Sequence, residues 1–151
     1  MTRRASALPP PSAPRGHYDL VVVHGGLAYV SGHLPRNGED ILHPGKVGGS
    51  CTFANAQEAA RASALACLSS LEKKLGTLDA IERVLKVTGY VASASGFNMQ
   101  TEIVNAASQV IVEQLGPERG AHARSAVGVA ELPRDASVEI EMICALAPWR
   151  T

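Results

Sequence analysis

Residues 123–146 read ARSAVGVAELPRDASVEIEMICAL, and the fold prediction starts from this stretch. From Ser137 to Leu146 apolar residues fill every second position, a pattern typical of a β-strand with one buried face. A shorter alternation precedes it over residues 124–130, and Leu132-Pro133 lies between the two. The sequence therefore predicts two strands joined by a turn.

These two strands place a cation and a carboxylate away from the predicted core. If both strands bury their apolar faces together, Arg124 and Glu139 point to the opposite side, among small residues such as Ala126. Such a pair is either a binding site or an ordinary cross-strand ion pair, which contributes at most about 1 kcal/mol when exposed. The pattern alone leaves both interpretations open.

Length and composition limit the classes of protein to which this chain can belong. A chain of 151 residues, of which 46% are hydrophobic, suits one domain, which we place at residues 16–151. The proline-containing segment 1–15 is expected to be a poorly ordered lead-in. Fourteen basic and fourteen acidic residues cancel and only 4% are aromatic, so the composition argues against a nucleic-acid-binding surface.

The sequence also predicts a cytoplasmic protein without a metal. No apolar run is long enough to cross a membrane, and the first residues lack the apolar region of a secretory signal. Three scattered cysteines, Cys51, Cys67 and Cys144, have no metal-ligand spacing, which favours reduced thiols in the cytoplasm.

The rest of the chain predicts an α+β fold. Glycines at 25 and 26 separate two short apolar runs, which indicates a hairpin over residues 20–30, and a long loop follows. Helices are predicted over residues 52–75 and 98–115, with a central strand at 83–93 between them. The order predicts a mostly antiparallel sheet with two helices on one face. The other face keeps apolar residues such as Ile143, so we expect it to be buried by self-association.

Several motifs resemble one known family. Arg124-Ser125, Leu132-Pro133 and the run 138–141 (VEIE) are similar to the closing signature of the RidA or YjgF family of reactive intermediate deaminases, often labelled endoribonuclease L-PSP. Weaker matches, spread over residues 16–146, are Tyr18, Ser31-Gly32 with Leu34-Pro35, and Val104-Asn105. The resemblance implies a chorismate-mutase-like fold and a homotrimer with clefts between subunits. It also implies hydrolysis of enamines and imines, such as 2-aminoacrylate, to 2-keto acids and ammonia, with no cofactor or metal.

The resemblance assigns roles residue by residue. Arg124 matches the arginine that binds the substrate carboxylate, and Glu139 the glutamate that orients or activates the attacking water. Residues matching substrate-binding positions are Tyr18, Ser31, Asn105 and Ala126.

Two positions depart from the family pattern. Ala126 stands where many members have cysteine, and His122 where they have proline. These departures leave the natural ligand open. We expect both His122 and His33 to be exposed.

Three functions are compatible with these residues. An enamine/imine deaminase is favoured because Arg124 and Glu139 are both present. A non-catalytic or regulatory protein that binds a small carboxylate such as a keto acid would need Arg124 alone. A ribonuclease or translation inhibitor is disfavoured by the neutral charge and by the lack of paired catalytic histidines at a recognisable spacing.

Overall fold

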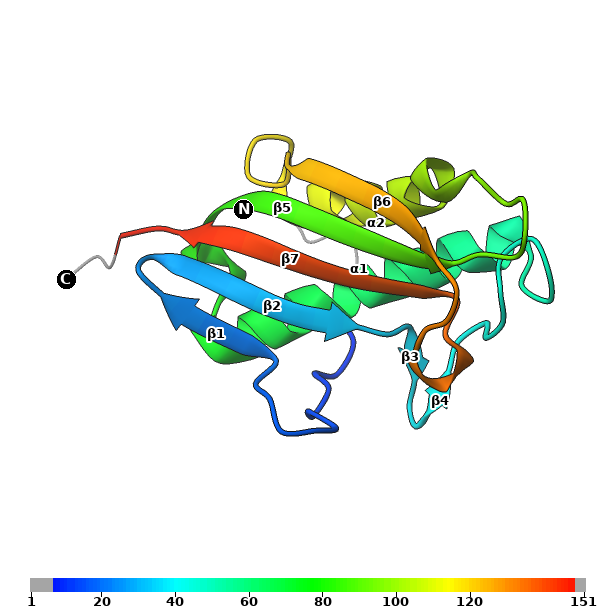
Figure 1. The fold of residues 1–151 in the computed structure, drawn as a ribbon. Helices are drawn as coiled ribbons and strands as arrows, with labels where there is room; N and C mark the ends of the chain where they lie inside the picture. Colours follow the sequence, from blue (N-terminus) through cyan, green and yellow to red (C-terminus); the bar gives the residue numbers. More distant parts are fainter. Residues whose placement is uncertain (1–6, 149–151) are drawn as a thin grey trace.

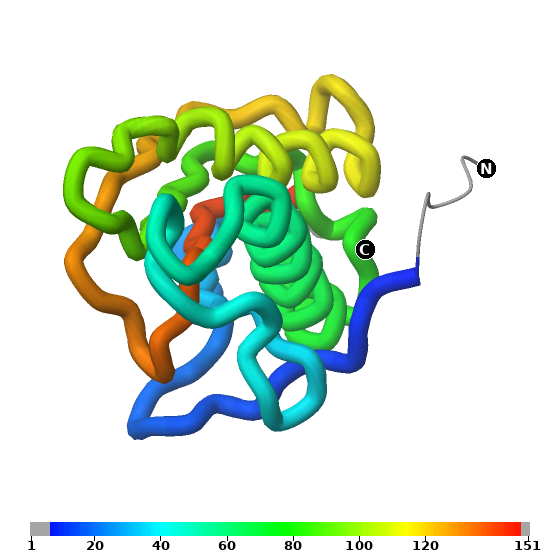
Figure 2. The backbone as a smooth tube through the Cα atoms, turned by 90° about the vertical axis from the view of Figure 1, so that its right-hand side faces the viewer, coloured from blue at the N-terminus to red at the C-terminus, as the bar shows by residue number. Residues whose placement is uncertain are grey.

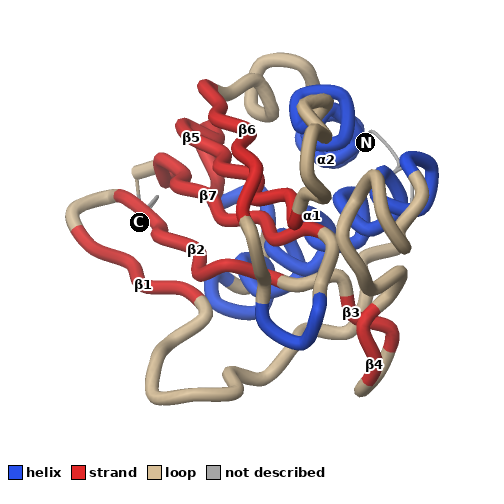
Figure 3. Tube along the Cα trace, turned by 45° about the vertical axis from the view of Figure 1, so that its right-hand side comes forward, coloured by secondary structure: helices blue, strands red, loops and turns tan. Residues whose placement is uncertain are grey.

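A five-stranded sheet, covered on one face by two helices, forms the body of the computed structural model, which describes residues 7–148 (Figure 1). The strand order is β1-β2-β7-β5-β6. The helices are α1 (Phe53–Leu75) and α2 (Gln100–Leu115), and the sheet strands are β1 (Val21–His24), β2 (Leu27–His33), β5 (Ile81–Ala92), β6 (Ala123–Val129) and β7 (Val138–Leu146). Figure 3 separates the layer of strands from the layer of helices. The predicted fold class, with two helices on one face of a mostly antiparallel sheet, is confirmed.

The closing strands differ from the prediction, because β6 and β7 do not form a hairpin. Strand β5 lies between them, pairing antiparallel with β7 and parallel with β6 (Figure 1). The intervening helix α2 provides the long crossover that parallel strands require, whereas β6 and β7 are joined by residues 130–137, which include a short 3-10 helix (Pro133–Asp135). The predicted turn is therefore a connection across the end of the sheet.

Helix α1 begins and ends as its sequence predicts. The side chain of Thr52 accepts a hydrogen bond from the backbone N–H of Asn55 at 3.2 Å, and Gly76 closes the helix in the left-handed conformation with φ 82°. Its fully buried face is rich in small residues, among them Ala56, Ala59, Ala60 and Ala64. These small side chains let α1 pack closely across the sheet.

Helix α2 also approaches the sheet closely, at a glycine of β5. A Cβ atom added to Gly89 would lie 2.5 Å from Cγ2 of Val104 in α2. The glycine therefore sets the distance at which α2 lies over β5 and β6. This distance matters because α2 supplies the partners of Arg124.

The face of the sheet turned away from the helices is partly apolar. Val22 and Tyr29 are paired across β1 and β2, and Ile143 is the next partner along the row. Val22 is 48% exposed, Tyr29 45% and Val127 of β6 41%, which are large fractions for apolar side chains. Exposed apolar side chains at both edges of one sheet face are typical of a surface that another protein covers.

The N-terminal segment was expected to be poorly ordered, and its first residues, 1–6, lie outside the described range. Residues 7–15 pass across α1 (Figure 2). Leu8 packs against the core, and the hydroxyl of Ser69 donates to the carbonyl of Pro9 at 2.7 Å. Pro9, Pro10 and Pro11 share a cavity with Ala62, Leu65 and Ala66 of α1, which are not on its fully buried face.

The long loop after β2 contains a small hairpin of β3 (Arg36–Asn37) and β4 (Asp40–Ile41) that the sequence did not predict. Its residue Val47 bridges to Cys51 and Ser93. A short 3-10 helix (Leu78–Ala80) precedes β5. Across residues 7–148 we find no helix with the length and apolarity needed to span a membrane.

Candidate functional site

Arg124 is held by neutral oxygen atoms of α2. Its Nη1 donates to Oδ1 of Asn105 at 2.9 Å and to Oγ of Ser108 at 3.0 Å, and its Nη2 lies 3.4 Å from the carbonyl of Thr101. Among residues 7–148, no carboxylate lies within ion-pair distance of this guanidinium. A positioned cation without a counter-charge is suited to bind an anion.

His122 continues this polar network. Its Nδ1 lies 2.6 Å from the carbonyl of Gly120, which can only accept, so Nδ1 carries the proton. Its Nε2, 2.9 Å from Oγ of Ser108, then accepts from the serine hydroxyl. Burial lowers the pKa of His122, and the positive charge of Arg124 acts in the same direction. The neutral ring thus orients Ser108, whose oxygen receives the N–H of Arg124.

The exposed positions predicted for both histidines are wrong. His122 is half-buried in this network, and His33 is almost completely buried at the end of β2. His33 bridges Ser31 and α1, with Nδ1 donating to the carbonyl of Ser31 at 2.6 Å and Nε2 2.7 Å from Oγ of Ser70. The sequence placed both rings in loops, where an exposed side chain is the usual outcome.

Replacing His33 by glutamine should flatten part of the pH dependence of stability. Burial lowers the pKa of His33 below its usual 6.5. His33 therefore binds a proton more readily in the unfolded chain than in the folded one. The stability that the neutral buried ring contributes is lost as pH falls from about 6.5 toward the lower pKa of the folded state. Denaturant unfolding of wild type and variant at matched pH values between 5 and 8 measures this difference.

A matched control is His24→Gln at the exposed end of β1. The pH dependence of stability that remains in His33→Gln arises from other groups, including His122, whose pKa is also lowered. An unchanged slope in His33→Gln would contradict the assignment of a buried neutral ring.

Glu139 lies on the other side of the molecule from Arg124. It lines a cavity of about 290 Å³ together with Tyr18, Gly32 and Pro133. A Cβ atom at Gly32 would overlap its carboxylate, so the glycine gives Glu139 room to lie across β2. Burial, and secondly the charge of Glu141, raise the pKa of the Glu139 carboxyl. A raised pKa makes this carboxylate a stronger proton acceptor.

Arg124 and Glu139 do not share a face of the sheet within one chain, contrary to the prediction. Arg124 is the register partner of Val87, which is fully buried on the helix side. Glu139 is the partner of Tyr90, whose hydroxyl donates to Oε1 of Glu141 at 2.6 Å on the open face. The cross-strand ion pair considered from the sequence is therefore excluded.

The remaining predicted residues divide between these two regions. Asn105 contacts Arg124, and Tyr18 shares the cavity of Glu139. The hydroxyl of Ser31 donates to the carbonyl of Asp19 at 2.6 Å, and Ser31 lines a cavity of about 250 Å³ on the open face. Ala126 packs against the core on the helix side, so it is not part of the open face on which we placed it.

Comparison with known proteins agrees with this fold. Residues 10–146 match the model of a family described as endoribonuclease L-PSP. The chain belongs to this family. The L-PSP chain is 40% identical to the Trypanosoma cruzi protein TCP17 over 146 residues, which are 97% of this chain and 91% of that protein.

Two solved structures resemble the L-PSP chain. One is a protein of unknown function from Agrobacterium tumefaciens, with 42% identity, a TM-score of 0.82, and 85% of this chain and 82% of that one covered. The other is the YjgF gene product of E. coli, with 25% identity, a TM-score of 0.61, and coverage of 90% and 92%. The resemblance to the YjgF family inferred from the closing motifs is confirmed.

Thr101 and Ser108 were not predicted from the sequence as contacts of Arg124 in this L-PSP chain. Thr101, Asn105 and Ser108 follow the spacing i, i+4, i+7, which places them on one face of the predicted helix. That spacing could have identified Ser108 and Thr101 as partners for a side chain on a neighbouring strand. Within residues 7–148, no three His, Cys, Asp or Glu side chains are grouped as metal ligands.

Proposed function

We propose that this chain hydrolyses reactive enamines and imines that carry a carboxylate, giving 2-keto acids and ammonia. The observation that supports this most directly is the guanidinium of Arg124, which three neutral oxygen atoms hold and which no carboxylate in the described part of the chain neutralises. A substrate carboxylate would supply the missing counter-charge through two parallel N–H···O bonds. Because Asn105 and Ser108 fix the arginine beforehand, little side-chain freedom is lost on binding.

The proposed site is completed by a second copy of the chain. Arg124 and Glu139 lie on opposite faces of the sheet, and the open face exposes Val22, Tyr29 and Val127. A homotrimer would cover this apolar face and bring Arg124 of one copy beside Glu139 of the next. Each cleft would then contain a carboxylate-binding arginine and a proton-transferring glutamate.

The chemistry that these groups would perform is simple. Water adds to C2 of the imine. Glu139 takes a proton from this water and passes the proton to the imine nitrogen. The C2–N bond then breaks, both water protons end on the departing ammonia, and C2 becomes the carbonyl of the keto acid. An enamine enters the same route after protonation of its carbon. The raised pKa of Glu139 supports both steps of this proton transfer.

A non-catalytic carboxylate-binding protein is the second candidate. The specific observation in its favour is that the Arg124 network is complete within one chain and does not need Glu139. The family's description also names an endoribonuclease. With formal net charge zero the chain has no excess of basic residues for following a phosphate backbone, so we rank this activity third.

The test is to generate an imine with an amino acid oxidase and to measure ammonia release with and without the protein. Acceleration over the spontaneous rate supports the deaminase, and sedimentation of the same sample should give the mass of a trimer. Binding of a keto acid without acceleration for any of several amino acids would instead identify the binding protein. A monomer would contradict the shared cleft.

A further inference from the structure

Three arginines surround the cavity that contains Glu139. Arg15 comes from the N-terminal segment, Arg36 from β3, and Arg134 from the connection before β7, and all three line the same space of about 290 Å³. They are far apart in the sequence, so the fold brings them together. Arg134 has a left-handed backbone with φ 56°, a conformation that is unfavourable for a residue with a Cβ and is enriched at ligand-binding sites.

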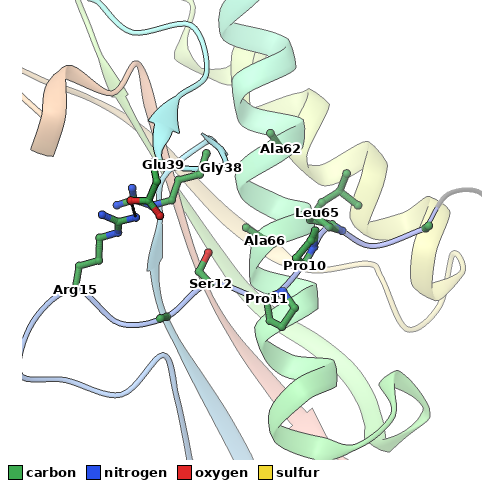
Figure 4. Close-up of a pocket in the computed structure, with 13 residues that line it drawn as sticks. Pro10, Pro11, Ser12, Arg15, Gly38, Glu39, Ala62, Leu65 and Ala66 are labelled. Carbon is green, nitrogen blue, oxygen red and sulfur yellow. Dashed lines mark hydrogen bonds and ion pairs between the residues drawn. The ribbon is translucent and has the colours of Figure 1, made fainter.

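Nearby carboxylates do not balance these three charges. Arg15 forms an ion pair with Glu39 at 2.8 Å, and Figure 4 shows the two side chains pointing toward each other. Within the described residues, Arg134 donates from Nη1 to the backbone carbonyl oxygen of Glu39 at 2.8 Å and forms no ion pair. Glu139 is the other carboxylate at the cavity, so three arginines face two carboxylates even when both are ionised. The cavity therefore has an excess of positive charge.

Arg36, which lines this cavity, has a buried donor without a partner in the described part of the chain. Its Nη1 is buried, and no acceptor within residues 7–148 forms a hydrogen bond with it. Burial, together with the charges of Arg15 and Arg134, lowers the pKa of Arg36. A buried donor without a partner is costly, and an anion bound between the three guanidinium groups would offset their like charges.

We propose that this arginine cavity binds a second anionic group of the substrate, so that the preferred imines carry two anionic groups. The inference rests on the proposed function, in which Arg124 of a neighbouring copy holds the first carboxylate. The second group is a carboxylate or a phosphate, since the guanidinium fork fits both. The imine of glutamate is a dicarboxylate of this kind, and the imine of glutamine has a similar shape with a neutral amide in place of the second carboxylate.

The kinetic test compares these two imines. In the wild type, kcat/KM for the glutamate imine should exceed that for the glutamine imine, and Arg36→Gln should reduce the ratio roughly 10- to 100-fold. Arg134→Gln is a second variant at the same cavity, and both variants should keep a wild-type melting temperature. Arg61→Gln, which removes an exposed ion pair with Glu113 on the helix layer, is the matched control and should leave the ratio unchanged. A wild-type ratio near one overturns the inference.

A binding test separates failure of the inference from failure of the proposed function. Calorimetry measures the binding of inorganic phosphate, succinate and acetate to the Arg124→Ala variant, in which the other anion site has been removed. Binding that is lost in Arg36→Gln and kept in Arg61→Gln supports the anion site even when neither imine is hydrolysed. Tighter binding of phosphate than of succinate indicates a phosphorylated substrate, and the reverse order a dicarboxylate. Equal binding before and after Arg36→Gln overturns the site.

Discussion

Replacing Arg124 by alanine is expected to lower kcat/KM for imine hydrolysis roughly 10²- to 10³-fold, the usual effect of removing one partner of a buried charge-assisted pair. The loss should fall mainly on KM, because the carboxylate is bound in both the ground state and the transition state. Arg124→Lys should recover only part of the activity, since an ammonium group cannot make two parallel hydrogen bonds. The measurement is initial ammonia release over a range of imine concentrations.

The fold should survive this substitution. The partners left behind, Asn105 and Ser108, are not fully buried and can bond water instead. Arg61→Ala is the control, because its exposed ion pair with Glu113 contributes little to stability. Activity of Arg124→Ala within a few-fold of wild type would remove the basis of the proposed function.

The second large effect is expected for Glu139→Gln, which should reduce kcat roughly 10²- to 10⁴-fold, the range ascribed to a positioned general acid–base. Carboxylate binding, measured with the product keto acid, should change little. In the wild type kcat should fall as pH falls through the raised pKa of Glu139, because the base becomes protonated. The variant should lack this acid limb.

Glu141→Gln provides the matched comparison for Glu139. Glu141 lies on the same face of β7, bonded to Tyr90, and its charge contributes to the raised pKa of Glu139. The variant should therefore keep its activity and move the acid limb to lower pH. Equal losses of kcat in both variants would argue that charge on this face matters and that no specific base acts there.

The sequence predicted the structure best where the residues of a single helix or strand determine its bounds and its buried face. Strand β7 buries Val138, Ile140 and Met142 in strict alternation, as expected from residues 137–146. Helix α1 begins after Thr52 and ends at Gly76, because capping depends on local backbone chemistry. Such features can be read without knowing what packs against them.

Strand β6 shows why the rest could not be read in this way. Its more apolar face, with Val127 and Val129, was predicted to be buried, but Val127 is exposed and the face with Arg124 and Ala126 is turned toward the helices. Alternation therefore chose the wrong face, because pairing with β5 turns Arg124 toward α2. The burial of His33 depends on Ser70 of α1, a contact far along the chain that no local pattern encodes.

The placement of Arg124 and Glu139 on opposite faces has a genetic consequence. In the proposed trimer each cleft takes its arginine from one subunit and its glutamate from the next, so two inactive proteins can repair each other. When Arg124→Ala and Glu139→Gln subunits are refolded together in equal amounts, about a quarter of the clefts regain both wild-type residues. Recovered activity in the mixture, absent from either variant alone, would be complementation between alleles. It would also explain why a carrier of two different defective copies can retain function.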